Sequence, residues 1–181
     1  MHGLILAELQ RYVHTNVGPQ AWVDACRIAC VGSTAYTMQH EYPEGDLAAL
    51  VAAGAQVLNV PAQSLLEDFG HFMVPGLMTV CAPHLPPSWG ALDVLESPER
   101  HLLLAERLTG RAVTPAVVHA ERLSQREVRI TYGSERWMCG LARGIVRGIL
   151  AHFREVAAVR ETDCMLRGAP ACIIDVTRIG S

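Results

Sequence analysis

The chain has 181 residues, of which half are hydrophobic and 18% are charged, and its net charge at pH 7 is -3. This length fits one domain with a sizeable core, and the small negative charge argues against nucleic acid or an anionic membrane as the main partner. The high hydrophobic fraction indicates that apolar surface lines a ligand cavity or meets a partner.

The N-terminus, the apolar stretches and the cysteines indicate the cellular compartment of the protein. The N-terminus lacks a basic region followed by an apolar run, which argues against a signal peptide. Charged residues interrupt every apolar stretch before it reaches the length of about eighteen residues that a spanning helix needs. We therefore expect a cytoplasmic protein whose six cysteines are reduced thiols or metal ligands.

Apolar residues at helical spacing predict helices through the first part of the chain. Pro75, between Val74 and Gly76, is expected to break or kink the fourth helix, and the prolines of residues 82–90 predict a loop. The predicted helices span residues 3–12, 19–30, 46–58, 61–72, 77–81 and 97–109.

After Gly110 the pattern changes to period two, which is typical of strands. The predicted strands span 116–120, 127–132, 156–166 and 171–179, with a helix over 136–153. We therefore expect an α+β fold in which residues 1–181 form a single domain. A helical N-terminal lobe (residues 1–110) would precede a C-terminal lobe (residues 111–181) with a four-stranded antiparallel sheet and one long helix.

Residues 131–136 close an alternating segment with two hydroxyls and a guanidinium. Tyr132, Ser134 and Arg136 lie on one side of the chain if the extended geometry persists. A guanidinium binds a carboxylate through two parallel hydrogen bonds, and hydroxyls donate to the remaining lone pairs. The trio therefore suits a ligand with one or two carboxylates. The alternative is a strand-to-helix cap in which Arg136 pairs with a surface acid.

The trio has the form Y-x-S-x-R, and the chain begins with M-x-G-x-I. With the length and the order of elements, these signatures make the whole chain similar to the heme nitric oxide/oxygen binding (H-NOX) family, in its stand-alone bacterial type. The resemblance implies a heme b cofactor whose propionates are held by the trio. It also implies that Pro115 presses on the porphyrin and that Ile5 is the apolar residue on the opposite edge.

An axial donor to the heme iron is also required, and neutral imidazole is usual in gas sensors. In the family this histidine lies about thirty residues before Y-x-S-x-R, and His101 is the histidine at that distance. The family pattern N-L-D-x-L-H is altered, because residues 97–100 read S-P-E-R and residues 92–96 resemble a displaced copy with Glu96 in place of histidine. An insertion near position 97 explains both features. The alternative is that His101 is a solvated helix-start residue and the chain has lost its iron ligand.

A second set of metal ligands comes from the C-terminal region. Cys164 and Cys172 bracket the last hairpin, Cys139 lies in the first turn of the preceding helix, and Glu161 stands three residues before Cys164. Four such donors form the closed tetrahedral set that structural zinc prefers. The resemblance supports zinc, since some bacterial H-NOX proteins and the vinyl-reductase-type sensing domains carry three cysteines with a histidine or glutamate there. Glu161 and Cys164 would share a site only if the strand bends. The alternative is three buried free thiols.

The polarity of the gas-binding pocket predicts the ligand. Family members that hold dioxygen supply a tyrosine from the helix after Y-x-S-x-R, where this chain has Leu141, and Leu9 on the first helix is also apolar. Bound dioxygen needs a hydrogen-bond donor, whereas nitric oxide and carbon monoxide do not. We therefore expect binding of nitric oxide and carbon monoxide but not dioxygen. Weakening of the bond between iron and His101 by nitric oxide would release residues 97–109.

The sequence contains no nucleophile–base pairing or phosphate loop, so we expect no catalytic activity. It also contains no kinase, cyclase or DNA-binding segment, so the signal would pass to a separate protein such as a histidine kinase or a cyclic-dinucleotide enzyme. The alternative is a heme-free domain of the vinyl-reductase type that stores a small apolar ligand and has a structural zinc site.

Overall fold

The computed structural model describes residues 3–37, 40–98 and 117–180. Within these ranges, six α-helices and one four-stranded antiparallel sheet form an α+β fold, which confirms the predicted class. The chain divides into two compact units, Met1–Phe69 and Gly70–Ser181. Helix α4 (Ala62–Cys81) begins in the first unit and ends in the second. The lobe boundary that we predicted after residue 110 lies outside the described residues.

The first unit contains α1 (Gly3–Asn16), α2 (Pro19–Ala29), α3 (Asp46–Leu58) and the start of α4. Gly18 separates α1 from α2 with a φ of 121°, a backbone conformation that side chains other than glycine rarely adopt. The apolar faces of the helices meet in a core, which includes Leu6, Leu9, Trp22, Leu47, Leu50, Leu65 and Phe69.

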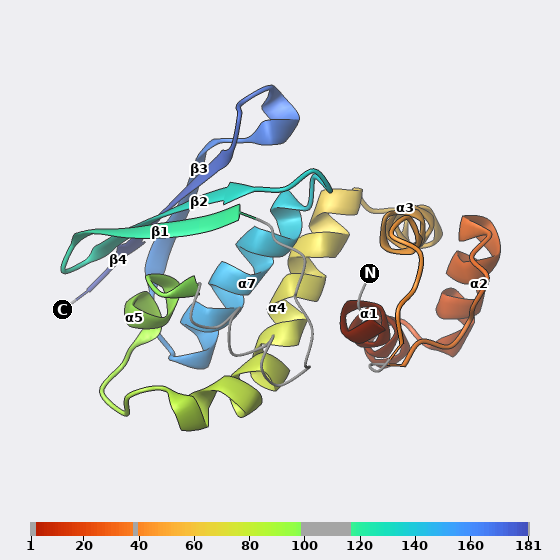
Figure 1. Ribbon diagram of the computed structural model, residues 1–181, viewed down its shortest axis with the longest axis horizontal. Helices are drawn as coiled ribbons and strands as arrows, with labels where there is room; N and C mark the ends of the chain where they lie inside the picture. The colour runs from red at the N-terminus through yellow and green to blue at the C-terminus, as the bar shows by residue number, and fades with distance from the viewer. Residues whose placement is uncertain (1–2, 38–39, 99–116, 181) are drawn as a thin grey trace. The chain divides into compact units, whose positions relative to one another are not determined.

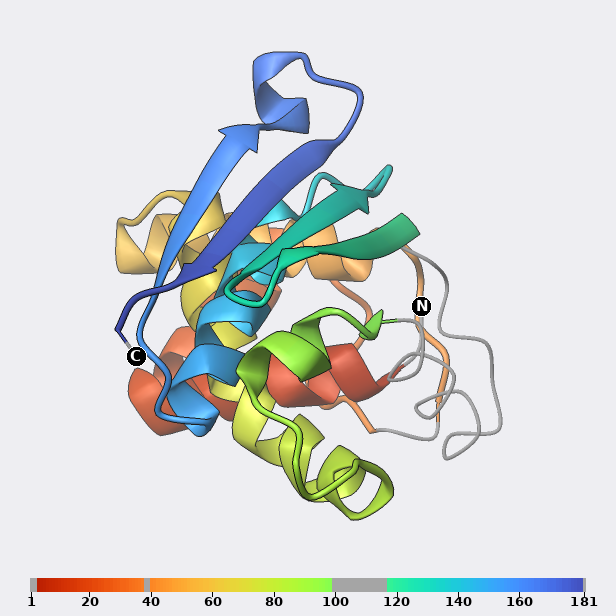
Figure 2. The same cartoon turned by 90° about the vertical axis from the view of Figure 1, so that its left-hand side faces the viewer.

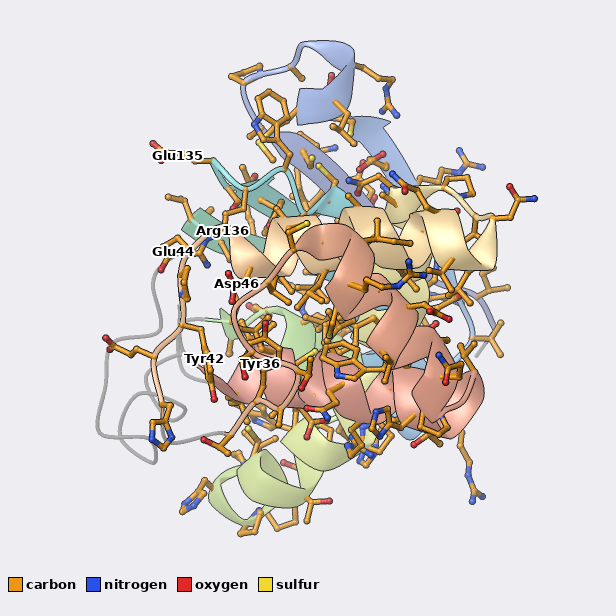
Figure 3. All side chains as sticks on the ribbon, turned by 90° about the vertical axis from the view of Figure 1, so that its right-hand side faces the viewer. Tyr36, Tyr42, Glu44, Asp46, Glu135 and Arg136 are labelled. Atoms are coloured by element: carbon orange, nitrogen blue, oxygen red, sulfur yellow. The ribbon has the colours of Figure 1, made fainter. Side chains whose placement is uncertain are left out.

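Aromatic contacts hold the segment between α2 and α3 on this core. The hydroxyl of Tyr36 donates to Asp46 Oδ2 at 3.1 Å, and the Tyr36 ring lies 4.6 Å from that of Tyr42 and 5.9 Å from that of Trp22. Figure 3 shows Tyr36 and Tyr42 on this segment, with Asp46 at the start of α3. Asp46 is thereby buried with a hydrogen-bond partner at the positive end of a helix, where a carboxylate is stabilised.

Among the described residues, no single helix has the length and apolar character to cross a membrane. Helix α3 and residues 62–79 meet these requirements only as a pair, and the two are bent by 105°.

The second unit is built on a sheet with strand order β1-β2-β4-β3, in which every neighbouring pair is antiparallel. The strands are β1 (Val117–Ser124), β2 (Glu127–Gly133), β3 (Ala157–Asp163) and β4 (Cys172–Arg178). Helices α5 (Ala91–Leu95) and α7 (Cys139–His152) cover one face of the sheet (Figures 1 and 2). Alternate residues of β2 and β4 point to this face and form the core with both helices: Ala91, Leu92, Leu95, Val128, Ile130, Val146, Leu150, Ile174 and Val176.

We predicted a break or a kink at Pro75, and the break is absent, because helix α4 continues to Cys81. Proline has no N–H to donate to the carbonyl of His71, so this carbonyl loses its helical partner. A Cβ at Gly148 of α7 would lie 3.1 Å from the His71 oxygen and 2.5 Å from Val74 Cγ2. A Cβ at Gly70 would lie 2.5 Å from the Leu141 oxygen. Close packing through glycine therefore holds the part of α4 before the proline against α7.

Other boundaries also differ from prediction. Helix α7 begins at Cys139 rather than at residue 136, because Trp137 has a φ of 54° and is outside the helical range. Strand β3 ends at Asp163, and a 3-10 helix, η2 (Met165–Arg167), replaces its expected last residues. Helix α5 was not predicted, because its five residues are too few to show a period.

Candidate functional site

The predicted carboxylate-binding trio lies where β2 ends and the chain turns towards α7. Tyr132 is on β2, opposite Val118 of β1 and Cys172 of β4, and only 7% of it is exposed. Ser134 and Arg136 follow in the turn and are half-buried, whereas Glu135 is exposed (Figure 3). The turn is closed by the Trp137 N–H, which donates to the Ser134 carbonyl at 3.1 Å.

Hydrogen bonds join the three residues. The Ser134 hydroxyl oxygen accepts the Arg136 backbone N–H at 3.2 Å and is hydrogen-bonded to the Tyr132 side chain. Burial raises the pKa of Tyr132 despite the opposing effects of Ser134 and Arg136, so this phenol is protonated at neutral pH and can donate. A phenol, a hydroxyl and a guanidinium within five residues fit a carboxylate ligand, as predicted for a heme propionate.

The other residues predicted to contact heme are distributed over both units and the residues that the structure does not describe. Leu141 is half-buried on α7 in the second unit. Ile5 is half-buried and Leu9 is buried on α1 in the first unit. His101 and Pro115 lie outside the described residues.

The three predicted cysteine ligands come together in the second unit. Cys139 begins α7, Cys164 follows β3, and Cys172 begins β4. All three are buried, and their sulfur atoms lie within 4.8 Å of one another. The Cys172 Sγ lies 3.1 Å from that of Cys139 and 3.8 Å from that of Cys164. A tetrahedral zinc ion with Zn–S bonds of about 2.3 Å separates its sulfur ligands by about 3.8 Å, so the cluster fits zinc with a small adjustment.

The surroundings of the thiols bear on their ionisation. Burial raises the pKa of Cys139 and Cys172, and the proximity of the thiols adds to the rise for Cys139. The Met165 backbone N–H donates to Cys172 Sγ at 3.4 Å, which opposes the rise at Cys172. The raised pKa values keep Cys139 and Cys172 as neutral thiols when no cation is bound, and a bound cation would offset the charge of the thiolates.

Glu161, the predicted fourth ligand, is not part of the sulfur group. Its Oε1 accepts from Arg143 Nη1 at 3.1 Å, and its Oε2 accepts from Arg167 Nη1 at 3.2 Å. The expected bend is present as a register shift in the β3–β4 pairing between Glu161 and Asp163. Nothing in the spacing of the sequence predicts either arginine, because Arg143 is on α7 and Arg167 is in η2.

Residues 92–96, which resemble a displaced copy of the family's histidine pattern, form most of α5 and its end. Arg122 of β1 donates to Asp93 Oδ1 at 2.7 Å and to Glu96 Oε2 at 2.8 Å, and Glu155 accepts the Ala91 N–H at 2.7 Å. Glu96 thus forms an ion pair with Arg122 of the sheet.

A model of the Haem-NO-binding family matches residues 2–161 of the chain. Three similar solved structures show the same fold. An H-NOX protein from S. oneidensis in the Fe(II)NO ligation state has a TM-score of 0.86 and 22% identity, and the match covers 99% of this chain and 100% of that chain. The NMR structure of an H-NOX domain from Shewanella oneidensis in the Fe(II)CO ligation state has a TM-score of 0.85 and 22% identity, with both chains fully covered. The Fe(II) unliganded H-NOX protein from K. algicida has a TM-score of 0.86 and 15% identity, with 100% of this chain and 98% of that chain covered.

No curated protein matches the chain. The family match and the structural similarities favour the H-NOX prediction over the heme-free, vinyl-reductase-type alternative.

Proposed function

The chain belongs to the Haem-NO-binding family, a family of heme-based gas sensors, and we propose that it senses nitric oxide and carbon monoxide through heme b. The observation that carries the proposal is the turn after β2, where Tyr132, Ser134 and Arg136 offer three donors to a carboxylate. These residues would hold the propionates, and the heme, when bound, would supply an iron atom that binds a diatomic gas.

The roles of the other residues in this proposal are inferred from the sequence. His101 would donate the axial imidazole, while Ile5 and Pro115 would contact the edges of the porphyrin. The signal would pass to a separate protein, such as a histidine kinase or a cyclic-dinucleotide enzyme, and the domain would have no catalytic activity of its own.

We also propose that dioxygen is excluded as a ligand. Leu9 and Leu141 have no donor groups, so neither residue can provide the hydrogen bond that bound dioxygen requires. Nitric oxide and carbon monoxide need no such bond.

Absorption spectroscopy tests both parts of the proposal. We expect the purified protein, reconstituted with hemin, to show a Soret band with one iron per chain, and the reduced protein to shift its spectrum under carbon monoxide and nitric oxide. Under air the reduced protein should oxidise without a stable oxy spectrum. A stable oxy spectrum would contradict the selectivity, and failure to bind hemin would contradict the sensor function.

The cysteine cluster supports a second proposed ligand, zinc. Cys139, Cys164 and Cys172 would be three ligands, since their buried sulfur atoms lie within 4.8 Å of one another. Glu161 would complete the set only by leaving at least one of its arginine partners. We therefore expect one zinc per chain by metal analysis of protein purified under reducing conditions.

A further inference from the structure

We propose that the cysteine cluster controls how firmly the heme propionates are held, because Tyr132 belongs to both sites. This inference rests on the proposed function, since it requires that heme binds the trio and that zinc binds the thiols. It adds a thermodynamic coupling between them, and Tyr132 is the positioning residue that transmits it.

Packing provides the first connection. Tyr132 lies in one buried cluster with Cys139, Cys164, Met165 and Cys172. Tyr132 and Cys172 are direct partners across β2 and β4, so their side chains share a face with Cβ atoms about 4.5–5.5 Å apart. The phenol of Tyr132 therefore has the thiol cluster on one side, while its hydroxyl is hydrogen-bonded to Ser134.

The backbone provides the second connection. Cys139 begins α7 immediately after the turn that carries Ser134 and Arg136. This turn is closed by two hydrogen bonds to Ser134, from the N–H groups of Arg136 and Trp137. A displacement of Cys139 would thus reach the propionate-binding turn through a short, internally bonded segment.

The sulfur distances indicate that zinc binding moves at least one of these sulfur atoms. Cys139 Sγ and Cys172 Sγ are 3.1 Å apart, whereas two ligands of a tetrahedral zinc ion are separated by about 3.8 Å. Both cysteines are fully buried, and a close-packed interior does not absorb such a change without movement of the neighbouring side chains. Tyr132 is among those neighbours, so zinc-loaded and zinc-free protein should present its hydroxyl differently to a propionate.

The test compares heme loss from the same reduced protein with zinc bound and after treatment with a zinc-selective chelator. The rate is followed as transfer of heme to apomyoglobin, which changes the Soret band. We expect zinc removal to accelerate heme loss about fivefold or more, the size of ordinary coupling between two sites. By linkage, hemin should raise the affinity for zinc by the factor by which zinc raises the equilibrium affinity for hemin.

Two variants identify the residue that transmits the effect. Tyr132→Phe keeps the ring but removes the hydroxyl, so heme should be lost faster and at a rate that no longer depends on zinc. Tyr42→Phe is the matched control: its hydroxyl accepts the Thr37 N–H in the first unit, and it should retain the full zinc dependence.

Each contrary result has a distinct meaning. Protein that holds both zinc and heme but loses heme at one rate, with or without zinc, overturns the coupling and leaves the proposed function intact. Full zinc dependence in Tyr132→Phe overturns the role of Tyr132. Protein that holds heme but no zinc overturns the metal site, and the coupling with it.

Discussion

Arg136 provides the most direct test of the propionate assignment at the level of single residues. Arg136→Leu removes a charged donor, and hydrogen bonds to charged groups contribute about 1.5–3 kcal/mol. We therefore expect the rate of heme loss to rise at least about tenfold, because 1.4 kcal/mol corresponds to a factor of ten. The control is Arg11→Leu on α1, whose guanidinium pairs with Glu8. Equal rates for the two variants would contradict the assignment.

Glu161 offers a second test, because Arg143 and Arg167 compete with zinc for its carboxylate. Arg167 is 57% exposed, so its pair with Glu161 contributes little, about 0.2–1 kcal/mol. Arg167→Gln should consequently raise the affinity for zinc only about two- to fivefold, measured by competition with a chelator. Glu161→Gln should lower the affinity.

The control for this pair of variants is Arg160→Gln, an exposed arginine on the same strand, which should leave zinc binding unchanged. If Glu161→Gln binds zinc as tightly as the unaltered protein, the carboxylate is not a ligand and the fourth position is filled by another group.

At the scale of elements, the contact between α4 and α7 depends on glycine. Gly148→Ala would place a methyl group 2.5 Å from Val74 Cγ2. Overpacking costs about 1–3 kcal/mol, against a helical gain of about 1 kcal/mol for alanine over glycine. We expect a lower midpoint of urea unfolding. Gly32→Ala meets no atom within 4 Å and should not lower it. Equal midpoints for the two variants would show that α4 and α7 separate easily.

Of the two outcomes that we predicted at Pro75, a break or a kink, the break is absent, because α4 continues to Cys81. The sequence rule considers the helix alone, in which proline removes a hydrogen bond and crowds the preceding turn. In the structure, Gly70, His71 and Val74, which precede Pro75, pack closely against α7, and this packing holds the first part of α4 in place.

For the whole molecule, we expect zinc to contribute to global stability. A closed metal site exists only in the folded chain, so its binding free energy adds to the free energy of unfolding. Treatment of the reduced protein with a chelator should lower the melting temperature by at least about 5 °C, and so should the substitution Cys172→Ala. A loss of 1 kcal/mol in the free energy of unfolding lowers the melting temperature of a chain of this size by about 2–4 °C.

The exposed thiol of Cys30 provides the control for this measurement. Cys30→Ser should retain both the zinc and the melting temperature. If the chelator leaves the melting temperature of the unaltered protein unchanged, the three thiols pack in the core without a metal.

Local patterns in the sequence were sufficient to predict the fold class and the family. The period of the apolar residues distinguishes helices from strands, because each element buries one face, and the observed α+β architecture follows from this alternation. The Y-x-S-x-R and M-x-G-x-I signatures led to the H-NOX resemblance, which the family match confirms. The trio is accessible to sequence analysis because its members lie within five residues of one another.

Contacts between distant residues were decided only by the tertiary structure. The position of Tyr132 opposite Cys172 follows from the register of β2 and β4, which are separated by a helix and another strand. The arginine partners of Glu161 come from α7 and η2, and the glycine contacts of α4 come from a helix about seventy residues later. Such pairs leave no periodic signal, because each depends on how two separate elements pack and on which side chains the packing brings within bonding distance.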